Sequence, residues 1–255
     1  MQKIIKKFYL GSFYVITLLL SGLLLILHVV FKTAGRYSVS FPQLAPAFAV
    51  LVLAVILKDE TELHKIKEYL SFRKISIEWI AVLLVLACVF IISSSLIMTL
   101  LGSPLVPWSG NWLFYLLSIL AMLIGCFTEE IGWRGFLLPH LQERYSPFLS
   151  SIIIGILWGA WHLNFDSGIW GFILFTVTCI EMSLLMTYIF NKTNSSLVLM
   201  FLWHFIINLL SHIFLLGRFG VSLYLVECIV FGAVCAVVVI ADRERFFSKP
   251  QPVLQ

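Results

Sequence analysis

The chain has 255 residues, of which 61% are hydrophobic and only 12% are charged, and its mean hydropathy is +1.03. This composition excludes an ordinary soluble domain and is typical of a protein that crosses a membrane several times. The formal net charge is only +4, and nothing in the sequence indicates a nucleic-acid partner.

Eight apolar stretches have roughly the 17 to 25 residues that a transmembrane helix needs. They are residues 8–31, 41–57, 77–101, 112–138, 147–164, 169–190, 195–216 and 221–240. The longest polar segment between them, Lys58 to Lys74, is too short for a soluble domain. Its charges recur at helical spacing, which predicts a solvated and partly helical surface. The sequence therefore predicts an all-α, polytopic bundle of about eight spans.

The basic residues predict how this bundle is oriented. If eight spans alternate across the bilayer, all of the 17 lysines and arginines except Lys32, Arg36 and Arg218 fall on one side. Lysine and arginine are enriched in cytoplasmic loops. We therefore expect both termini to be cytoplasmic. The first apolar run is longer than that of a signal peptide, and we interpret it as a retained span of a multi-pass protein of the bacterial cytoplasmic membrane.

The polar residues of the spans are concentrated in the second half of the chain. We divide the sequence into motif-free spans at 1–111, a polar-rich helical segment at 112–216, and a last span with a short cytoplasmic tail at 217–255. Ionisable residues inside a membrane are costly and usually mark a functional site. The polar residues of this part are the ionisable Glu129, Glu130, Arg134, His162, Glu181, His204, His212 and Glu227 and the neutral Asn208.

Two glutamates and an arginine occur near the end of the fourth span. Pro139 is expected to end this helix near Leu138, because proline lacks the backbone donor. Glu129 would then lie about 14 Å from the cytoplasmic end, at 1.5 Å per residue. Glu130 and Arg134 are four residues apart and can form an ion pair on one face. Glu129 is about 100° around the helix and can face another partner.

Two later helices carry the remaining candidates. The fifth span opens with Ser146 and a proline, which are typical of a helix N-terminus. His162 follows near the other end of this span, with Trp158 one turn before it. In the seventh span, His204 and Asn208 are four residues apart and share a face. Allowing for helix tilt, these groups lie at similar depths, so we expect them to converge with Glu129.

Such a cluster has the parts that amide hydrolysis needs. A buried carboxylate can take a proton from water as a general base. Two imidazoles and an amide can donate hydrogen bonds to a developing oxyanion. Glu181, His212 and Glu227 are more simply interpreted as polar groups that pack between helices.

The motifs at these positions resemble those of the CAAX prenyl endopeptidase and bacteriocin-processing (CPBP, or Abi) family of intramembrane proteases. The family pattern is EExxxR, FxxxH and HxxxN/D. Glu129 to Arg134 match the first motif and His204 to Asn208 the third, and the second has Trp158 in place of phenylalanine. The resemblance covers roughly residues 112–215.

The resemblance implies a role for each of these residues. It implies that Glu129 and His162 activate water and that His204 and Asn208 stabilise the oxyanion. Glu130, Arg134 and Trp158 would then support the site. These seven positions are our candidate site residues.

A metal-dependent variant of the site stays open. Some members of the family have been classed as metalloproteases, and Glu129, His162 and His204 could bind Zn²⁺ with one open position. However, the chain contains no HExxH motif, and asparagine is a poor zinc ligand. We therefore favour a mechanism without a cofactor, in which a glutamate activates the water.

Three hypotheses for the function follow. The first is an intramembrane endopeptidase that cleaves a membrane-associated peptide or protein, such as a prenylated or bacteriocin-like substrate. The second is a non-catalytic membrane scaffold or bacteriocin self-immunity protein, with the segment 58–74 as its binding surface. The third is a proton-coupled transporter that uses Glu129, Glu181 and the histidines, which the lack of a convincing internal repeat disfavours.

Overall fold

The computed structural model of the protein describes residues 8–30, 40–58, 60–105, 112–215, 218 and 220–248. All of its regular elements are helices, and no strand occurs in these ranges. The predicted all-α fold is therefore confirmed. The chain termini and two of the three basic residues that break the charge bias, Lys32 and Arg36, lie outside the described residues.

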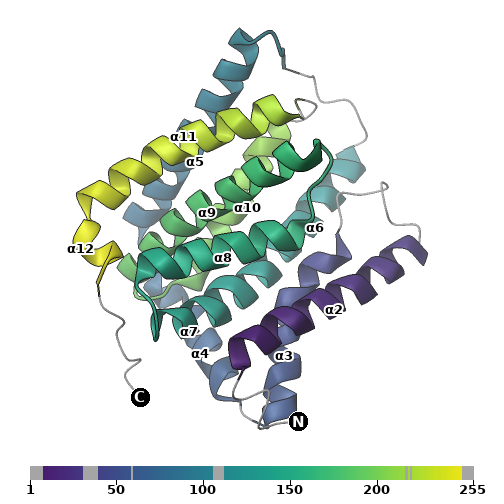
Figure 1. The fold of residues 1–255 in the computed structure, drawn as a ribbon, viewed down its shortest axis with the longest axis vertical. Helices are drawn as coiled ribbons and strands as arrows, with labels where there is room; N and C mark the ends of the chain where they lie inside the picture. The colour runs from purple at the N-terminus through teal and green to yellow at the C-terminus, as the bar shows by residue number, and fades with distance from the viewer. Residues whose placement is uncertain are drawn as a thin grey trace.

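The helices lie side by side in a bundle (Figure 1). Their bounds are α2 Tyr9–Val30, η1 Phe41–Leu44, α3 Ala45–Leu57, α4 Thr61–Tyr69, η2 Phe72–Lys74, α5 Ile77–Leu100, α6 Trp112–Glu130, η3 Ile131–Leu137, α7 Leu138–Gln142, α8 Pro147–His162, α9 Gly168–Lys192, α10 Leu197–Phe214, α11 Val221–Ala241 and α12 Arg243–Phe246.

Six of these helical segments are long and apolar enough to cross a membrane. Two further apolar helices, Phe41–Leu57 and Pro147–His162, are shorter. The apolar stretches recognised in the sequence thus correspond to helices, and the protein is a multi-pass membrane protein. The number of spans and the side on which the termini lie stay predictions.

The fourth span differs from the prediction at Pro139. The helix does not end near Leu138, because α6 continues through the π-helical segment η3 into α7, which ends at Gln142. Pro139 occupies the first turn of α7, where a missing backbone donor costs little. The wider turns of a π-helix close i→i+5 hydrogen bonds, so the preceding turn accommodates the proline ring without a break.

One end of the bundle is polar, and we call it the basic end. It holds α4, α7, α12 and the end of α9 (Figure 1). Glu62 lies 3.1 Å from Nζ of Lys65 and 3.6 Å from Nε2 of His140, and Lys192 lies 3.1 Å from Asp242. Burial alone would raise the pKa of Glu62, but its hydrogen bonds and ion pairs with His140 and Lys65 outweigh burial and lower this pKa.

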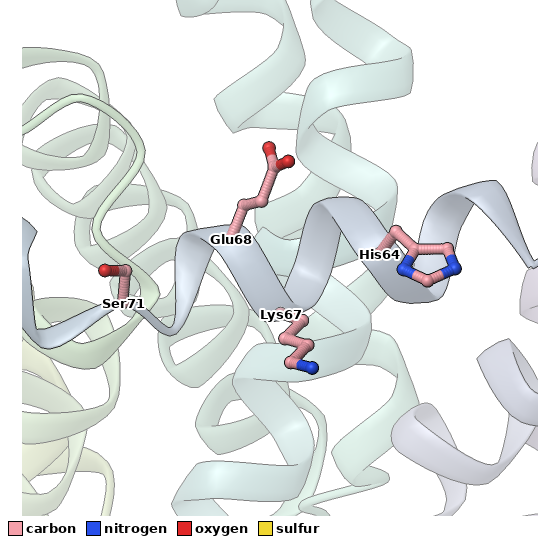
Figure 2. Close-up of a pocket in the computed structure, with 4 residues that line it drawn as sticks. All are labelled: His64, Lys67, Glu68 and Ser71. Atoms are coloured by element: carbon pink, nitrogen blue, oxygen red, sulfur yellow. The ribbon is translucent and has the colours of Figure 1, made fainter.

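The outer surface of α4 is hollowed. A pocket of about 530 Å³ is lined by His64, Lys67, Glu68 and Ser71. Figure 2 shows these four polar side chains along α4 and the residue that precedes η2. The mixed-charge segment is therefore a partly helical surface, as the spacing of its charges predicted.

Two glycines bring α8 and α9 into close contact. A Cβ atom added to Gly155 would overlap the Cα of Ile180, and one added to Gly159 would lie 2.7 Å from the Cα of Thr176. Small residues spaced four apart on one helix face allow the backbones of two membrane helices to come into contact. The contact fixes the position of the end of α8, where His162 lies.

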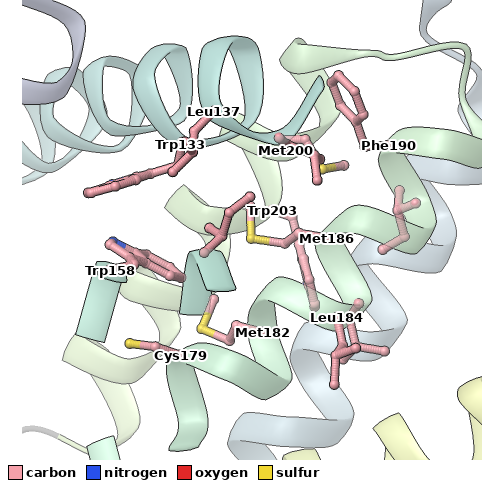
Figure 3. Packing of buried hydrophobic residues seen from close by; sticks show 14 of the residues in the cluster. Trp133, Leu137, Trp158, Cys179, Met182, Leu184, Met186, Phe190, Met200 and Trp203 are labelled. Atoms are coloured by element: carbon pink, nitrogen blue, oxygen red, sulfur yellow. The ribbon is translucent and has the colours of Figure 1, made fainter. Parts of the chain in front are cut away.

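A densely packed core fills the bundle between the centre and the basic end. It includes the buried side chains of Trp133, Leu137, Phe190, Met200 and Trp203. Figure 3 shows part of this core, with side chains from η3, α8, α9 and α10 in one interior. Interiors packed in this way leave little room for water or a ligand. The cavity beside the candidate site, described below, lies towards the opposite end.

Candidate active site

The first predicted site residues are the last two residues of α6. Glu129 and Glu130 are 0% exposed, and the π-helical segment η3 starts directly after them. π-Helical turns are rare and occur frequently at functional sites. Here the segment keeps both carboxylates and Arg134 inside the bundle.

Glu129 faces the residues of the second motif. Nε1 of Trp158 donates a hydrogen bond of 2.8 Å to Oε2 of Glu129. Nε2 of His162 lies 4.0 Å from the same oxygen. This separation is too long for a direct hydrogen bond. It leaves room for the oxygen atom of a water molecule to hydrogen-bond to both groups. The other oxygen, Oε1, is buried and accepts no hydrogen bond from the residues that the structure describes.

His162 is the more accessible member of this pair. Its side chain is 28% exposed, whereas that of Glu129 is 1% exposed. His162 is the last residue of α8, and Leu163 after it has φ of 48°, which turns the chain out of the helix. The ring of Phe175 packs edge-on against His162, with ring centroids 5.1 Å apart. His162 therefore lies where the site opens.

Glu130 and Arg134 form the ion pair that their spacing predicted. Nη1 of Arg134 lies 3.0 Å from Oε1 of Glu130, and Nη2 donates to Oγ of Ser183 at 3.0 Å. The guanidinium carbon also lies 4.4 Å from the centroid of the Trp158 ring. A buried charge is costly unless it is paired and hydrogen-bonded, and these contacts stabilise the arginine inside the bundle.

Glu130 has a second partner that the sequence analysis missed. Nδ1 of His204 lies 2.8 Å from Oε1 of Glu130, the same oxygen that accepts from Arg134. A carboxylate paired with arginine is ionised and only accepts hydrogen bonds. The proton between the two groups therefore belongs to His204.

Two neighbours of the motif residues were also missed. Nδ2 of Asn208 contacts Sγ of Cys126 at 3.4 Å, and Cys126 also interacts with His204. The position of Cys126, one turn before Glu130, was the available signal. Gln43 of η1 packs against Gly125, where an added Cβ would overlap its amide. No motif in residues 1–111 marked it.

The predicted catalytic groups thus lie around one tryptophan. The Trp158 ring centroid is 5.9 Å from that of His162 and 5.2 Å from that of His204. The three motifs converge, although their roles stay predictions. Glu181 lies apart, beside Gly232 of α11, and His212 contacts the backbone oxygen of Asn208 at 2.8 Å.

The arrangement does not fit the alternative zinc site. In the described part of the chain, no three His, Cys, Asp or Glu side chains are grouped so that they could hold a metal ion. We therefore derive no step through a metal.

Comparisons with known proteins point to the same class as the motifs. Residues 110–210 match a family model described as Type II CAAX prenyl endopeptidase Rce1-like. CAAX prenyl protease 2 of Methanococcus maripaludis is 26% identical to the chain over 95% of its residues, and the match covers 96% of that relative.

Two staphylococcal relatives match a shorter region. Lysostaphin resistance protein A of Staphylococcus haemolyticus is 28% identical over 61% of this chain, and that of Staphylococcus epidermidis is 29% identical over 62%. The chain spans less than half the length of these two relatives, 43% and 41%.

The helical bundle and the three motifs are those expected of the intramembrane-protease class. The family match and the archaeal relative confirm the resemblance that the motifs indicated: residues 110–210 are similar to Type II CAAX prenyl endopeptidases, and the chain as a whole is similar to a CAAX prenyl protease. These likenesses support a membrane protease.

Proposed function

We propose that the protein is an intramembrane endopeptidase in which Glu129 activates a water molecule. The observation that carries this proposal is the geometry at Oε2 of Glu129. Trp158 donates to this oxygen at 2.8 Å, and His162 lies 4.0 Å away. A general base must be positioned before it can work, and the indole holds the carboxylate in one orientation.

The reaction follows from these positions. Glu129 takes a proton from water while the water oxygen attacks the peptide carbonyl carbon, with His162 orienting the water. His204, protonated on both ring nitrogens, and Asn208 donate hydrogen bonds to the carbonyl oxygen, which becomes an oxyanion. The intermediate collapses by breaking the C–N bond, and the proton held by Glu129 moves to the leaving amine. Water is the only co-reactant.

The substrate is a peptide that is associated with the membrane. The relatives carry the names CAAX prenyl protease 2 and lysostaphin resistance protein A, and we propose a prenylated tail or a bacteriocin-like peptide as the substrate class. The apolar helices around the site favour an apolar or lipid-modified chain over a soluble one.

We further propose that the protein lies in a bacterial cytoplasmic membrane with its basic end in the cytoplasm, since basic loops favour that side. Fusions to the C-terminus test this orientation. A green fluorescent protein is expected to fluoresce there, and an alkaline phosphatase is expected to be inactive. An active phosphatase fusion would reverse the assignment.

The activity is tested with purified protein in detergent. Wild-type protein and the Glu129→Gln variant are incubated with prenylated C-terminal tails and bacteriocin leader peptides, and the products are identified by mass spectrometry. Cleavage by the wild type and the Glu181→Gln control, but not by Glu129→Gln, supports the proposal. Equal cleavage by wild type and Glu129→Gln would remove Glu129 from the mechanism.

The scaffold hypothesis rests on a different surface. The pocket on α4, with its four polar side chains, could bind a partner protein (Figure 2). If no peptide of the panel is cleaved, the two hypotheses are separated in cells that depend on the protein. Function that persists in Glu129→Gln and is lost when Lys67 and Glu68 are changed would favour the scaffold over the protease.

A further inference from the structure

A cavity lies beside the candidate site, towards the end of the bundle opposite the basic end. It has a volume of about 200 Å³ and is enclosed by α9, α10 and α11. Its polar lining is contributed by Thr178, Asn208, Ser211, His212, Tyr224 and Glu227, and apolar side chains complete the wall. Pockets for drug-sized ligands have roughly 300–1,000 Å³, so this cavity suits a single side chain.

The cavity borders the candidate site at one of its proposed catalytic groups, Asn208. Asn208, which belongs to the third motif, forms part of its wall. Phe175 is also in the wall, and it packs edge-on against His162 with ring centroids 5.1 Å apart. A peptide whose carbonyl oxygen lies against Asn208 would therefore place a neighbouring side chain in the cavity.

Glu227 gives the cavity its chemical character. It projects from α11 across from Asn208 and His212 of α10. In the ranges that the structure describes, no other residue makes a hydrogen bond or an ion pair with its carboxylate. Tyr224, one turn away, is by contrast engaged, because its hydroxyl accepts a hydrogen bond of 2.8 Å from Asn164. An unpaired carboxylate in an apolar bundle attracts a cation.

We infer that Glu227 is a specificity-determining residue, which binds a positively charged side chain of the peptide substrate in the cavity beside Asn208. This inference rests on the proposed protease function and adds a substrate class: apolar peptides with a lysine or arginine near the cleaved bond. A neutral side chain of the same length would fill the cavity and leave the carboxylate without a partner.

Binding can be measured separately from cleavage. The probes are fluorescent, apolar 12-residue peptides that carry one lysine, moved along the sequence, and matched peptides with norleucine at the same position. Affinities are measured by fluorescence anisotropy with the Glu129→Gln variant. Burying a charge opposite an unpaired carboxylate is expected to favour lysine over norleucine by about tenfold or more at one position.

Three further variants decide whether Glu227 is responsible. Adding Glu227→Gln is expected to abolish the lysine preference, and adding Glu227→Lys to favour a glutamate peptide instead. Glu181→Gln is the matched control, because this intramembrane glutamate lies beside Gly232 and does not line the cavity. It is expected to keep the preference. Thermal melting of each variant checks that it is folded.

The binding experiment can contradict the proposed cation site without contradicting the proposed protease function. Equal affinity for lysine and norleucine peptides at every position, measured with Glu227 intact, would contradict the cation site, even if the wild type cleaves peptides. A lysine preference that persists in Glu227→Gln would also contradict it. Failure of the protease proposal is recognised separately, by the absence of Glu129-dependent cleavage.

Discussion

Nδ1 of His204 lies 2.8 Å from Oε1 of Glu130, which also accepts a hydrogen bond from Arg134 at 3.0 Å. One carboxylate oxygen therefore connects the first motif to the third. Because Glu130 accepts hydrogen bonds in this arrangement, it keeps a proton on Nδ1 of His204 and fixes the orientation of the ring. Glu130 thus positions the imidazole that we assign to the oxyanion.

This relationship predicts that Glu130→Gln lowers the cleavage rate. An amide can donate to His204 as well as accept from it, so Nδ1 of the ring is no longer held in its protonated form. Removing a residue that orients a catalytic group typically costs 10- to 100-fold, and we expect a loss of about this size in kcat. Single-turnover cleavage kinetics measure it.

The matched control is Ser183→Ala. It removes the other hydrogen bond of Arg134 and leaves Glu130 and His204 unchanged. Because breaking a buried ion pair can destabilise a protein by about 3–5 kcal/mol, melting temperatures are compared first. If folded Glu130→Gln cleaved as fast as Ser183→Ala, Glu130 would have no positioning role.

The close contact of α8 with α9 makes a second prediction. An added methyl group in Gly159→Ala would lie 2.7 Å from the Cα of Thr176, and it must push the two helices apart. Overpacking of this kind costs typically about 1–3 kcal/mol. We expect a lower melting temperature and lower activity, because Trp158 and His162 lie on the displaced helix.

Gly22→Ala is the control for this prediction, because an added Cβ at Gly22 meets no atom within 4 Å. Its melting temperature should match that of the wild type, and alanine at this helical position can even stabilise slightly. Equal effects of Gly22→Ala and Gly159→Ala would show that the contact between α8 and α9 is not tight.

The motif spacing was sufficient to predict part of this site. The i,i+4 spacing of Glu130 and Arg134 indicated their ion pair because helical geometry alone brings such residues together. The convergence of Glu129, Trp158 and His162 also followed, from the similar depths of their helices. Apolar length identified the helices because lipid imposes that length on a span.

Other features depended on tertiary packing, which the sequence does not display. The contact between Glu130 and His204 joins residues 74 positions apart and depends on how α6 and α10 are rotated. The π-helical segment η3 has no pattern that distinguishes it from an α-helix. Cys126 and Gln43 carried no motif, and only the packed bundle brings them to the site.

A third prediction concerns the stability of the basic end at low pH. The pKa of Glu62 is lowered in the folded protein, so its ionised form stabilises the native state above the unfolded pKa of about 4.3. This stabilisation is lost as the pH falls through the lower native pKa. The melting temperature of the wild type should therefore fall more steeply below about pH 4.3 than that of Glu62→Gln.

Other carboxylates titrate in the same range, so the informative quantity is the difference in melting temperature between the wild type and Glu62→Gln. That difference should shrink as the pH decreases, since the protonated wild-type side chain resembles the amide. A difference in melting temperature that stays constant with pH would mean that Glu62 does not couple protonation to folding.

A fourth prediction addresses the metal. Since no three His, Cys, Asp or Glu side chains of the described residues are grouped to hold a metal ion, we expect cleavage to continue after prolonged treatment with EDTA or 1,10-phenanthroline. The metal content of the treated sample is measured by mass spectrometry in parallel. Loss of activity on chelation, with recovery when Zn²⁺ is added, would overturn the metal-free account.

The most direct test of the central claim is the single-turnover cleavage rate of Glu129→Gln, measured against that of the wild type on one identified substrate. Loss of a general base lowers a rate by about 10²–10⁴-fold. We predict a decrease within this range in a variant whose melting temperature is close to that of the wild type. A folded Glu129→Gln protein that cleaves at the wild-type rate would contradict the account.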